Sequence, residues 1–166
     1  RARGGSSRLS FCSPPPELAM SEKRSPAQQA SQASMAAVHA KDKEKWLSLF
    51  AEDAHVEDPI GTSSLDPTGA GHKGKKAISD FWDANVAPNR IVFNINASHA
   101  PVGSSEVANV GSIVTYLPAL NMTTVVNGVF IYKVDNDGKI TSLRAFWNWK
   151  QMAASGGVVQ HPEHKL

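Results

Sequence analysis

The sequence contains almost no cysteine: Cys12 is the only one among 166 residues. A single thiol cannot form a disulfide within the chain, so a folded domain here must rely on its core, and a reducing, cytoplasmic location is expected. No apolar run approaches the roughly 18 residues that a membrane-spanning helix needs. We therefore expect no membrane partner.

The sequence also lacks an excess of charge of either sign. Lys and Arg number 17 against 15 Asp and Glu, for a formal net charge of +2. The basic residues are interleaved with acids, which disfavours a nucleic-acid-binding surface. The short basic run GHKGKK at 71–76 precedes a predicted helix and could attract an anion, but it is better interpreted as a solvated face.

Motifs for cysteine-based metal sites and for covalent hydrolysis are missing as well. No Cys-x-x-Cys spacing and no G-x-S-x-G elbow occurs. We therefore predict no metal and no other cofactor.

The two ends differ in composition from the middle of the chain. Residues 1–23 begin with RARGGSSRLSFCSPPPELA, which is rich in Arg, Ser and Pro. This leader is interpreted as unfolded, either an organelle transit peptide or a remnant of expression or upstream translation. The tail at 153–166 lacks periodicity and is also predicted to be disordered. The folded domain is then expected at 24–152.

Three helices are predicted in the first half of the domain. Ser25 and Pro26 form a helix start, and the Ala-rich stretch after them continues to about Ala40. Asp42 can cap a second, short helix. A third helix is expected from about Lys75 to Asn85, before Pro88. The apolar residues expected to be buried by the second and third helices are Trp46, Leu47, Leu49, Phe50, Ile78, Phe81 and Trp82.

Strands dominate the second half. Four β-branched and aromatic stretches, near 90–99, 105–117, 122–134 and 139–149, follow one another, and DNDG at 135–138 predicts a hairpin turn between the last two. The interior glycines Gly111 and Gly128 are candidate bends. Helices followed by antiparallel strands predict an α+β fold, in which three helices close a strongly curved sheet around an apolar pocket.

The stretch AEDAHVEDPIG, residues 51–61, contains the main candidate for chemistry. Strand alternation places Ala54, Val56 and Asp58 on one face and the polar pair His55 and Glu57 on the other. Asp58 would then face an apolar interior, where loss of water raises a carboxyl pKa toward the range of a general base. The alternative is that Asp58 only opens the loop that follows Pro59.

A family resemblance bears on this choice. LFAEDAHVEDPIG, KGKKAISDFWDAN and GKITSLRAFWNW occur in the order and spacing of the bacterial ketosteroid isomerases, and the similarity covers roughly residues 30–150. The chain also resembles actinobacterial steroid-isomerase-like proteins, which share GVF-Y-V and WN in the final hairpin. This resemblance to the wider nuclear-transport-factor-2-like (NTF2-like, SnoaL-like) superfamily implies a conical α+β fold that dimerises through the outer face of its sheet.

The resemblance also implies residue roles. The general base of the family falls on Asp58, in VEDP. The two donors that hold the enolate oxygen in the family, a Tyr and a protonated Asp, fall on Ser34 and Phe130, so both are replaced. Losing one such donor typically costs about 10²–10³ in rate, so weak or altered activity is expected.

Aromatic residues supply the remaining candidates. Phe81, Phe93, Phe130 and Trp147 are predicted to line the ligand site. Tyr132 shares strand parity with Phe130 and can supply a donor, and Tyr116 is a further candidate with a polar group. For each tyrosine the alternative is packing with one satisfied hydrogen bond.

Three functions remain open at this point. The first is a ketosteroid-isomerase-like enzyme in which Asp58 moves a proton on a steroid or a similar apolar ketone. The second is a non-catalytic steroid-binding or hydrophobic-ligand-binding protein, which the missing donors favour. The third is a polyketide-cyclase-like enzyme. The expected partner is a small apolar, steroid-like ligand.

Overall fold

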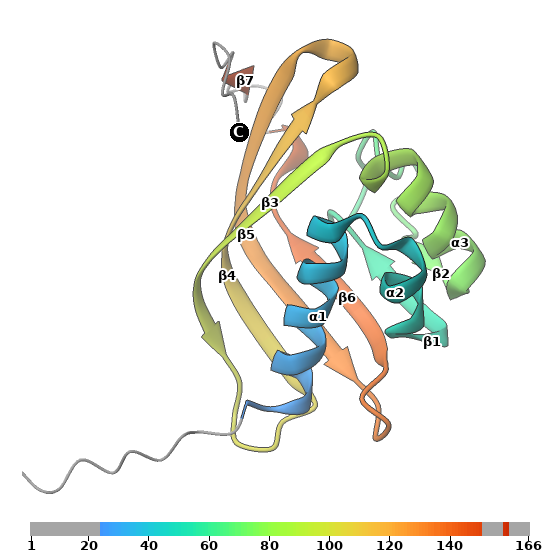
Figure 1. The fold of residues 1–166 in the computed structure, drawn as a ribbon, viewed down its shortest axis with the longest axis vertical. Helices are drawn as coiled ribbons and strands as arrows, with labels where there is room; N and C mark the ends of the chain where they lie inside the picture. Colours follow the sequence, from blue (N-terminus) through green and yellow to red (C-terminus); the bar gives the residue numbers. More distant parts are fainter. Residues whose placement is uncertain (1–23, 151–157, 160–166) are drawn as a thin grey trace, which may run out of the picture.

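The computed structural model describes residues 24–150 and the backbone of residues 158–159. Two α-helices come first, β1 and β2 separate them from the third, and the strands β3 to β6 follow (Figure 1). The helices are α1 (Pro26–Ala40), α2 (Lys43–Ser48) and α3 (Gly74–Phe81). The strands are β1 (Phe50–Glu57), β2 (His72–Lys73), β3 (Arg90–His99), β4 (Glu106–Leu117), β5 (Met122–Val134), β6 (Ile140–Phe146) and β7 (Val158–Val159).

Helix α1 begins where the sequence predicts. The Ser25 side chain accepts a hydrogen bond from the Gln28 backbone N–H, and the Gln28 side chain accepts one from the Ser25 N–H. This reciprocal capping box satisfies two otherwise unpaired backbone donors. The helix ends at Lys41, whose φ of 59° is left-handed. Its ammonium group donates to the Val86 and Asn89 carbonyls, which ties this turn to the segment before β3.

Two helix boundaries differ from the prediction. Helix α2 ends at Ser48, and Phe50 is the first residue of β1 rather than part of the helix. Phe50 is buried either way, since its ring packs 4.6 Å from Trp46, so burial alone could not assign its element. The third helix changes to a π-helical turn, Trp82–Val86, after Phe81. Ile78, Phe81 and Trp82 are buried as predicted.

The seven strands of the described residues form one sheet. Its order is β2-β1-β6-β5-β4-β3, with β7 paired to β5. The β1–β6 pair is parallel and the other pairs are antiparallel. The predicted final hairpin is confirmed as β5–β6. The leader at 1–23 and most of the 153–166 tail lie outside the described residues, and β7 falls within that tail.

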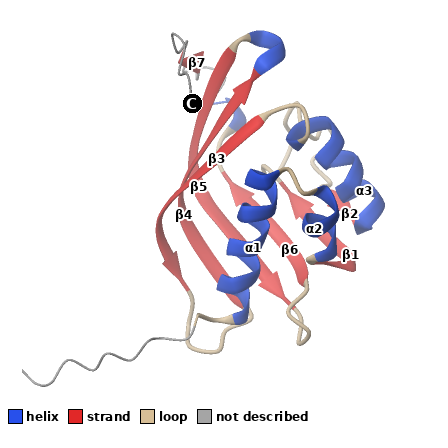
Figure 2. Ribbon diagram, viewed as in Figure 1, coloured by secondary structure: helices blue, strands red, loops and turns tan. Residues whose placement is uncertain are grey.

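The sheet is strongly curved, and the helices cover its concave face (Figure 2). Gly111 on β4 and Gly128 on β5 are direct partners in the ladder. A Cβ atom on Gly111 would collide with the Asn94 carbonyl oxygen, and one on Gly128 with the Phe146 carbonyl oxygen. These close approaches lie beside the register shift in β3 between Ile95 and Ala97. Both glycines therefore occupy the bend, as their position within long strands predicts.

The core fills the space between helices and sheet. Trp46 and Trp82 pack with ring centroids 5.0 Å apart, and Val56 and Ile140 contribute buried side chains from the sheet. Within the described part of the chain, no helix is long and apolar enough to cross a membrane.

Candidate functional site

Asp58 follows β1 directly and stands at the edge of the concave face. Ala54 and Val56, which precede it on the same side, are completely buried. Glu57, on the opposite side, pairs with Arg144 at 2.9 Å. The predicted alternation is therefore present, although Glu57 and His55 are not simply solvated: the Glu57 side chain is 16% exposed and His55 Nε2 lies 2.9 Å from the Ala70 carbonyl.

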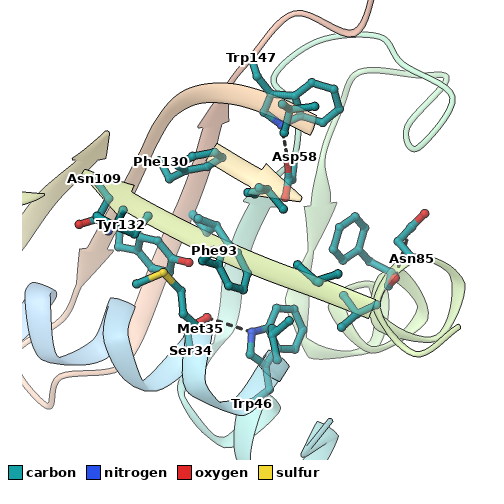
Figure 3. Close-up of a pocket in the computed structure, with 18 of the residues that line it drawn as sticks. Ser34, Met35, Trp46, Asp58, Asn85, Phe93, Asn109, Phe130, Tyr132 and Trp147 are labelled. Carbon is teal, nitrogen blue, oxygen red and sulfur yellow. Dashed lines mark hydrogen bonds between the residues drawn. The ribbon is translucent and has the colours of Figure 1, made fainter. Parts of the chain in front are cut away.

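Among the residues that the structure describes, the Asp58 carboxyl group has one hydrogen-bond partner. Trp147 Nε1 donates a hydrogen bond of 2.7 Å to Asp58 Oδ1 (Figure 3). Removal from water by the surrounding side chains raises the pKa of Asp58 to about 6, and the hydrogen bond from Trp147 opposes that rise. Desolvation disfavours the charged carboxylate, whereas a donor favours it. The result is a carboxyl group that changes charge close to neutral pH.

Register across the sheet explains which residues join Asp58. Ala145 on β6 pairs with Phe130 on β5, and Phe130 pairs with Asn109 on β4. The Ile60 N–H donates to the Ala145 carbonyl, which sets Asp58 beside the same row. All of these side chains point to the concave face, so one row carries a carboxylate at one end and an amide at the other.

A second inward row lies next to the first. Val56, Leu143, Tyr132 and Val107 are consecutive ladder partners, and all four are buried. Loss of water raises the pKa of the Tyr132 phenol to about 12; a hydrogen bond with Ser34 opposes the rise, and the Asp58 charge adds to it. Tyr132 is therefore a neutral hydroxyl group throughout the physiological pH range, and its O–H remains available as a donor.

Helix α1 covers one side of the cavity and contributes Ser34 to its wall. This serine is 1% exposed, and its Oγ accepts a 2.9 Å hydrogen bond from Trp46 Nε1 (Figure 3). Indole N–H groups only donate, so Ser34 must accept here and keeps its own hydroxyl hydrogen for another partner. Trp46, Ser34 and Tyr132 thus form a polar contact between the helices and the sheet.

The rows and helices enclose a mostly apolar cavity that is partly open to solvent. Concave, mostly apolar pockets with a few polar groups typically hold small apolar ligands. The residues that line it are Ser34, Met35, Val38, Trp46, Asp58, Leu65, Phe81, Asn85, Val86, Ile91, Phe93, Ile95, Asn109, Ile113, Val126, Phe130, Tyr132, Leu143 and Trp147.

The cavity brings together seven of the eight site residues named from the sequence. They are Ser34, Asp58, Phe81, Phe93, Phe130, Tyr132 and Trp147. Tyr116 does not join them: it lies near the end of β4, is 38% exposed, and its hydroxyl donates to the Asn121 side chain at 3.3 Å. Its parity on β4 is that of Val110 and Val114, on the outward face, and counting from the inward Asn109 would have excluded it.

Sequence reasoning missed three cavity residues that carry polar groups: Trp46, Asn109 and Asn85, the last of which it placed only at the end of the third helix. Trp46 was assigned to the core alone, and nothing in the local pattern predicts that its indole N–H meets Ser34. Asn109 was overlooked, although it lies two positions after Val107 and so shares its otherwise apolar face. The same signal, a polar residue on an apolar strand face, identified Asp58. Among the described residues, no group of three or more His, Cys, Asp or Glu side chains could hold a metal ion.

Comparisons with known proteins agree with this geometry. The SnoaL-like domain family matches residues 31–143. A steroid Δ-isomerase from Nocardioides simplex is 29% identical over 103 residues, covering 60% of this chain and 71% of that protein.

Two solved structures are also similar. The Δ5-3-ketosteroid isomerase from Mycobacterium sp. superposes with a TM-score of 0.73 at 38% identity, covering 82% of this chain and 98% of that one. RV0760c from Mycobacterium tuberculosis, in complex with estradiol-17β-hemisuccinate, has the same score and identity over 76% of this chain and 97% of its own.

Proposed function

This chain belongs to the SnoaL-like domain family, and from that membership we propose that it binds a steroid-like ketone and moves a proton on it, with Asp58 as the general base. The observation that carries the proposal is Asp58 itself: a carboxylate in an apolar cavity with a pKa of about 6. The similarity to two steroid isomerases and to a steroid-bound protein supports the choice of ligand.

In the proposed reaction Asp58 takes a proton from the carbon next to the ligand carbonyl. The C–H bond breaks, an O–H bond forms on the carboxyl group, and the electron pair moves onto the carbonyl oxygen to give a dienolate. The proton then returns to the far carbon of the conjugated system, and the enone product forms. Base and conjugate acid interconvert readily because the pKa of Asp58 lies near the working pH.

Trp147 and Tyr132 have supporting roles in this scheme. Trp147 occupies Asp58 Oδ1 at 2.7 Å, which fixes the plane of the carboxyl group and leaves Oδ2 for the proton transfer. Tyr132 remains protonated because its pKa is raised to about 12, so it can donate to the oxygen on which charge develops. It lies near enough to Asp58 for the carboxylate charge to raise the phenol pKa.

The test is conversion of a β,γ-unsaturated 3-ketosteroid to its conjugated isomer, followed by absorbance. Wild-type protein should convert it, and Asp58→Asn, which keeps the shape of the side chain, should lose at least about 10²-fold in kcat because a general base typically contributes 10²–10⁴. Asp53→Asn, on an exposed position of β1, is the matched control. Equal rates for wild type and Asp58→Asn would exclude Asp58 as the base.

A binding role without turnover is the second candidate, and Phe130 favours it. Phe130 lies in the row between Asp58 and Asn109, is 5% exposed, and offers no donor to a ligand oxygen. Saturable quenching of tryptophan fluorescence by steroids, without any conversion, would support this role. A polyketide-cyclase-like reaction on the same cavity would show instead as turnover of a cyclisable polyketide and not of the steroid.

We also propose that the outer sheet face forms a homodimer. Apolar side chains are exposed on the convex face of four strands, among them Val92, Val110, Val125 and Phe146. Exposed apolar patches commonly mark interfaces between copies of a chain. The cytoplasmic location expected from the sequence stays a prediction.

A further inference from the structure

Asn109 is a buried residue of the cavity wall whose amide nitrogen has no hydrogen-bond partner in the described part of the chain. It is 2% exposed, and its Nδ2 is completely buried with no acceptor among the residues that the structure describes. The other such atom in the described part of the chain, His72 Nε2, belongs to a ring that packs on Phe81 and does not line the cavity. A buried amide donor that stays unpaired is unfavourable, because the loss of its contacts with water is not compensated. Asn109 therefore needs an acceptor that the described residues do not supply.

The sheet places Asn109 beside Tyr132 and across from Asp58. Asn109 pairs with Phe130, and Tyr132 pairs with Val107, so Asn109 and Tyr132 are diagonal neighbours on one face of adjacent strands. Such neighbours lie within reach of a common partner. Asp58, at the end of β1, and Asn109, on β4, are three strand-to-strand steps apart across the sheet. Figure 3 shows Phe130 between them. At about 4.8 Å per strand this is roughly 14 Å between Cα atoms along the sheet, and less between side chains that converge on the concave face.

We propose that Asn109 Nδ2 donates a hydrogen bond to the ligand's carbonyl oxygen, as the second donor beside Tyr132. Of the side chains that β4 and β5 contribute to the cavity wall, Asn109 and Tyr132 are the polar ones. The terminal amide torsion of Asn is soft, so the group turns to present Nδ2 when an acceptor arrives. The inference rests on the proposed function, because it concerns the same ligand at the same site.

This arrangement specifies the ligand further. The base contacts the carbon that loses its proton, and the donors contact the oxygen two bonds away, on the neighbouring carbonyl carbon. The ligand is therefore oriented with its carbonyl toward β4 and β5. Both donors are neutral, and neither releases a proton near pH 7, so they favour an oxygen that gains charge without delivering a full proton to it. A phenolic steroid, whose ring oxygen imitates the dienolate oxygen, should bind more tightly than the same skeleton without that oxygen.

Binding of that ligand pair tests the inference without relying on turnover. Wild type should prefer the phenolic steroid over its 3-deoxy analogue by at least about tenfold, as one buried hydrogen bond provides. Asn109→Leu should lose about tenfold of this preference while its affinity for the deoxy analogue stays unchanged. Asn127→Leu, the same substitution at an exposed position of β5, should retain the preference. Thermal unfolding of each variant checks that the fold persists.

The kinetic arm separates Asn109 from the base. Asn109→Leu should lower kcat for the β,γ-unsaturated ketosteroid by about 10²-fold with little change in KM, as removal of one such donor does. Asn109→Leu with Tyr132→Phe should deviate from additivity, since both would contact one oxygen.

The outcomes distinguish the two proposals. Equal affinity of wild type for the phenol and its deoxy analogue, or an unchanged preference in Asn109→Leu, overturns the role of Asn109 and leaves Asp58 untouched. Failure of wild type to bind either steroid overturns the proposed ligand and this inference together.

Discussion

Removal of the indole donor from Asp58 should shift the pH at which the site works. Trp147→Phe keeps an aromatic ring beside the cavity and deletes the 2.7 Å hydrogen bond to Asp58 Oδ1. That bond favours the charged carboxylate, and hydrogen bonds to charged groups contribute about 1.5–3 kcal/mol. Because 1.36 kcal/mol corresponds to one pKa unit, the pKa of Asp58 should rise by roughly 1–2 units from its value of about 6.

The direction of the pH shift follows from the fact that the Trp147 hydrogen bond stabilises the ionised form of Asp58. The base must be ionised to accept a proton, so activity falls as the pH drops through the pKa of Asp58. In Trp147→Phe the acidic limb of the kcat/KM profile should move to higher pH by the same 1–2 units, with much of the lost rate recovered near pH 9. A ¹³C NMR titration of the Asp58 carboxyl carbon measures the same shift without substrate. If the acidic limb of the kcat/KM profile and the midpoint of the NMR titration stay where they are in wild type, or move to lower pH, Trp147 is not the donor that lowers the pKa of Asp58.

Three further predictions concern stability and assembly. The pKa of Asp58 is higher in the folded chain than its ordinary value of 3.8, so ionisation of Asp58 opposes folding above pH 6 and does not below pH 4. Asp58→Asn should therefore raise the free energy of unfolding by about 1–3 kcal/mol at pH 8 and leave it unchanged at pH 3.5. Urea denaturation at the two pH values measures this difference. Ser25→Ala removes the N-cap of α1 and should cost about 1 kcal/mol in the same assay, whereas Ser25→Asp should retain most of it. Val110→Glu on the convex face should convert a dimer to a monomer in sedimentation without changing the far-UV spectrum, and a monomeric wild type would exclude that interface.

The sequence predicted the fold well because its local signals agree with one another. The capped Ser25–Pro26 start, the long β-branched strands and the turn at 135–138 each correspond to an observed element. Phe50 was misassigned because an apolar residue just after a short helix is buried equally well by the helix or by a strand. The π-helical turn after Phe81 was also missed, since it leaves the same residues buried.

The site was only partly predictable, for a different reason. Strand alternation alone was enough to place the side chains of Asp58 and Tyr132 on the inward face. The contacts that give these groups their chemistry, from Trp147 to Asp58 and from Trp46 to Ser34, join residues 89 and 12 positions apart in the chain. Such contacts depend on how strands pair and where helices lie, which local patterns do not encode.

The most direct test of proton transfer by Asp58 is to follow the proton itself. A β,γ-unsaturated 3-ketosteroid deuterated at the carbon between the carbonyl and the double bond is converted by the protein, and the product is examined by NMR for deuterium at the far carbon. If Asp58 passes the proton on before it exchanges fully with water, part of the deuterium should appear at the far carbon with wild type and none with Asp58→Asn. Product that carries only solvent hydrogen at that carbon, formed equally by both proteins, would contradict the role of Asp58.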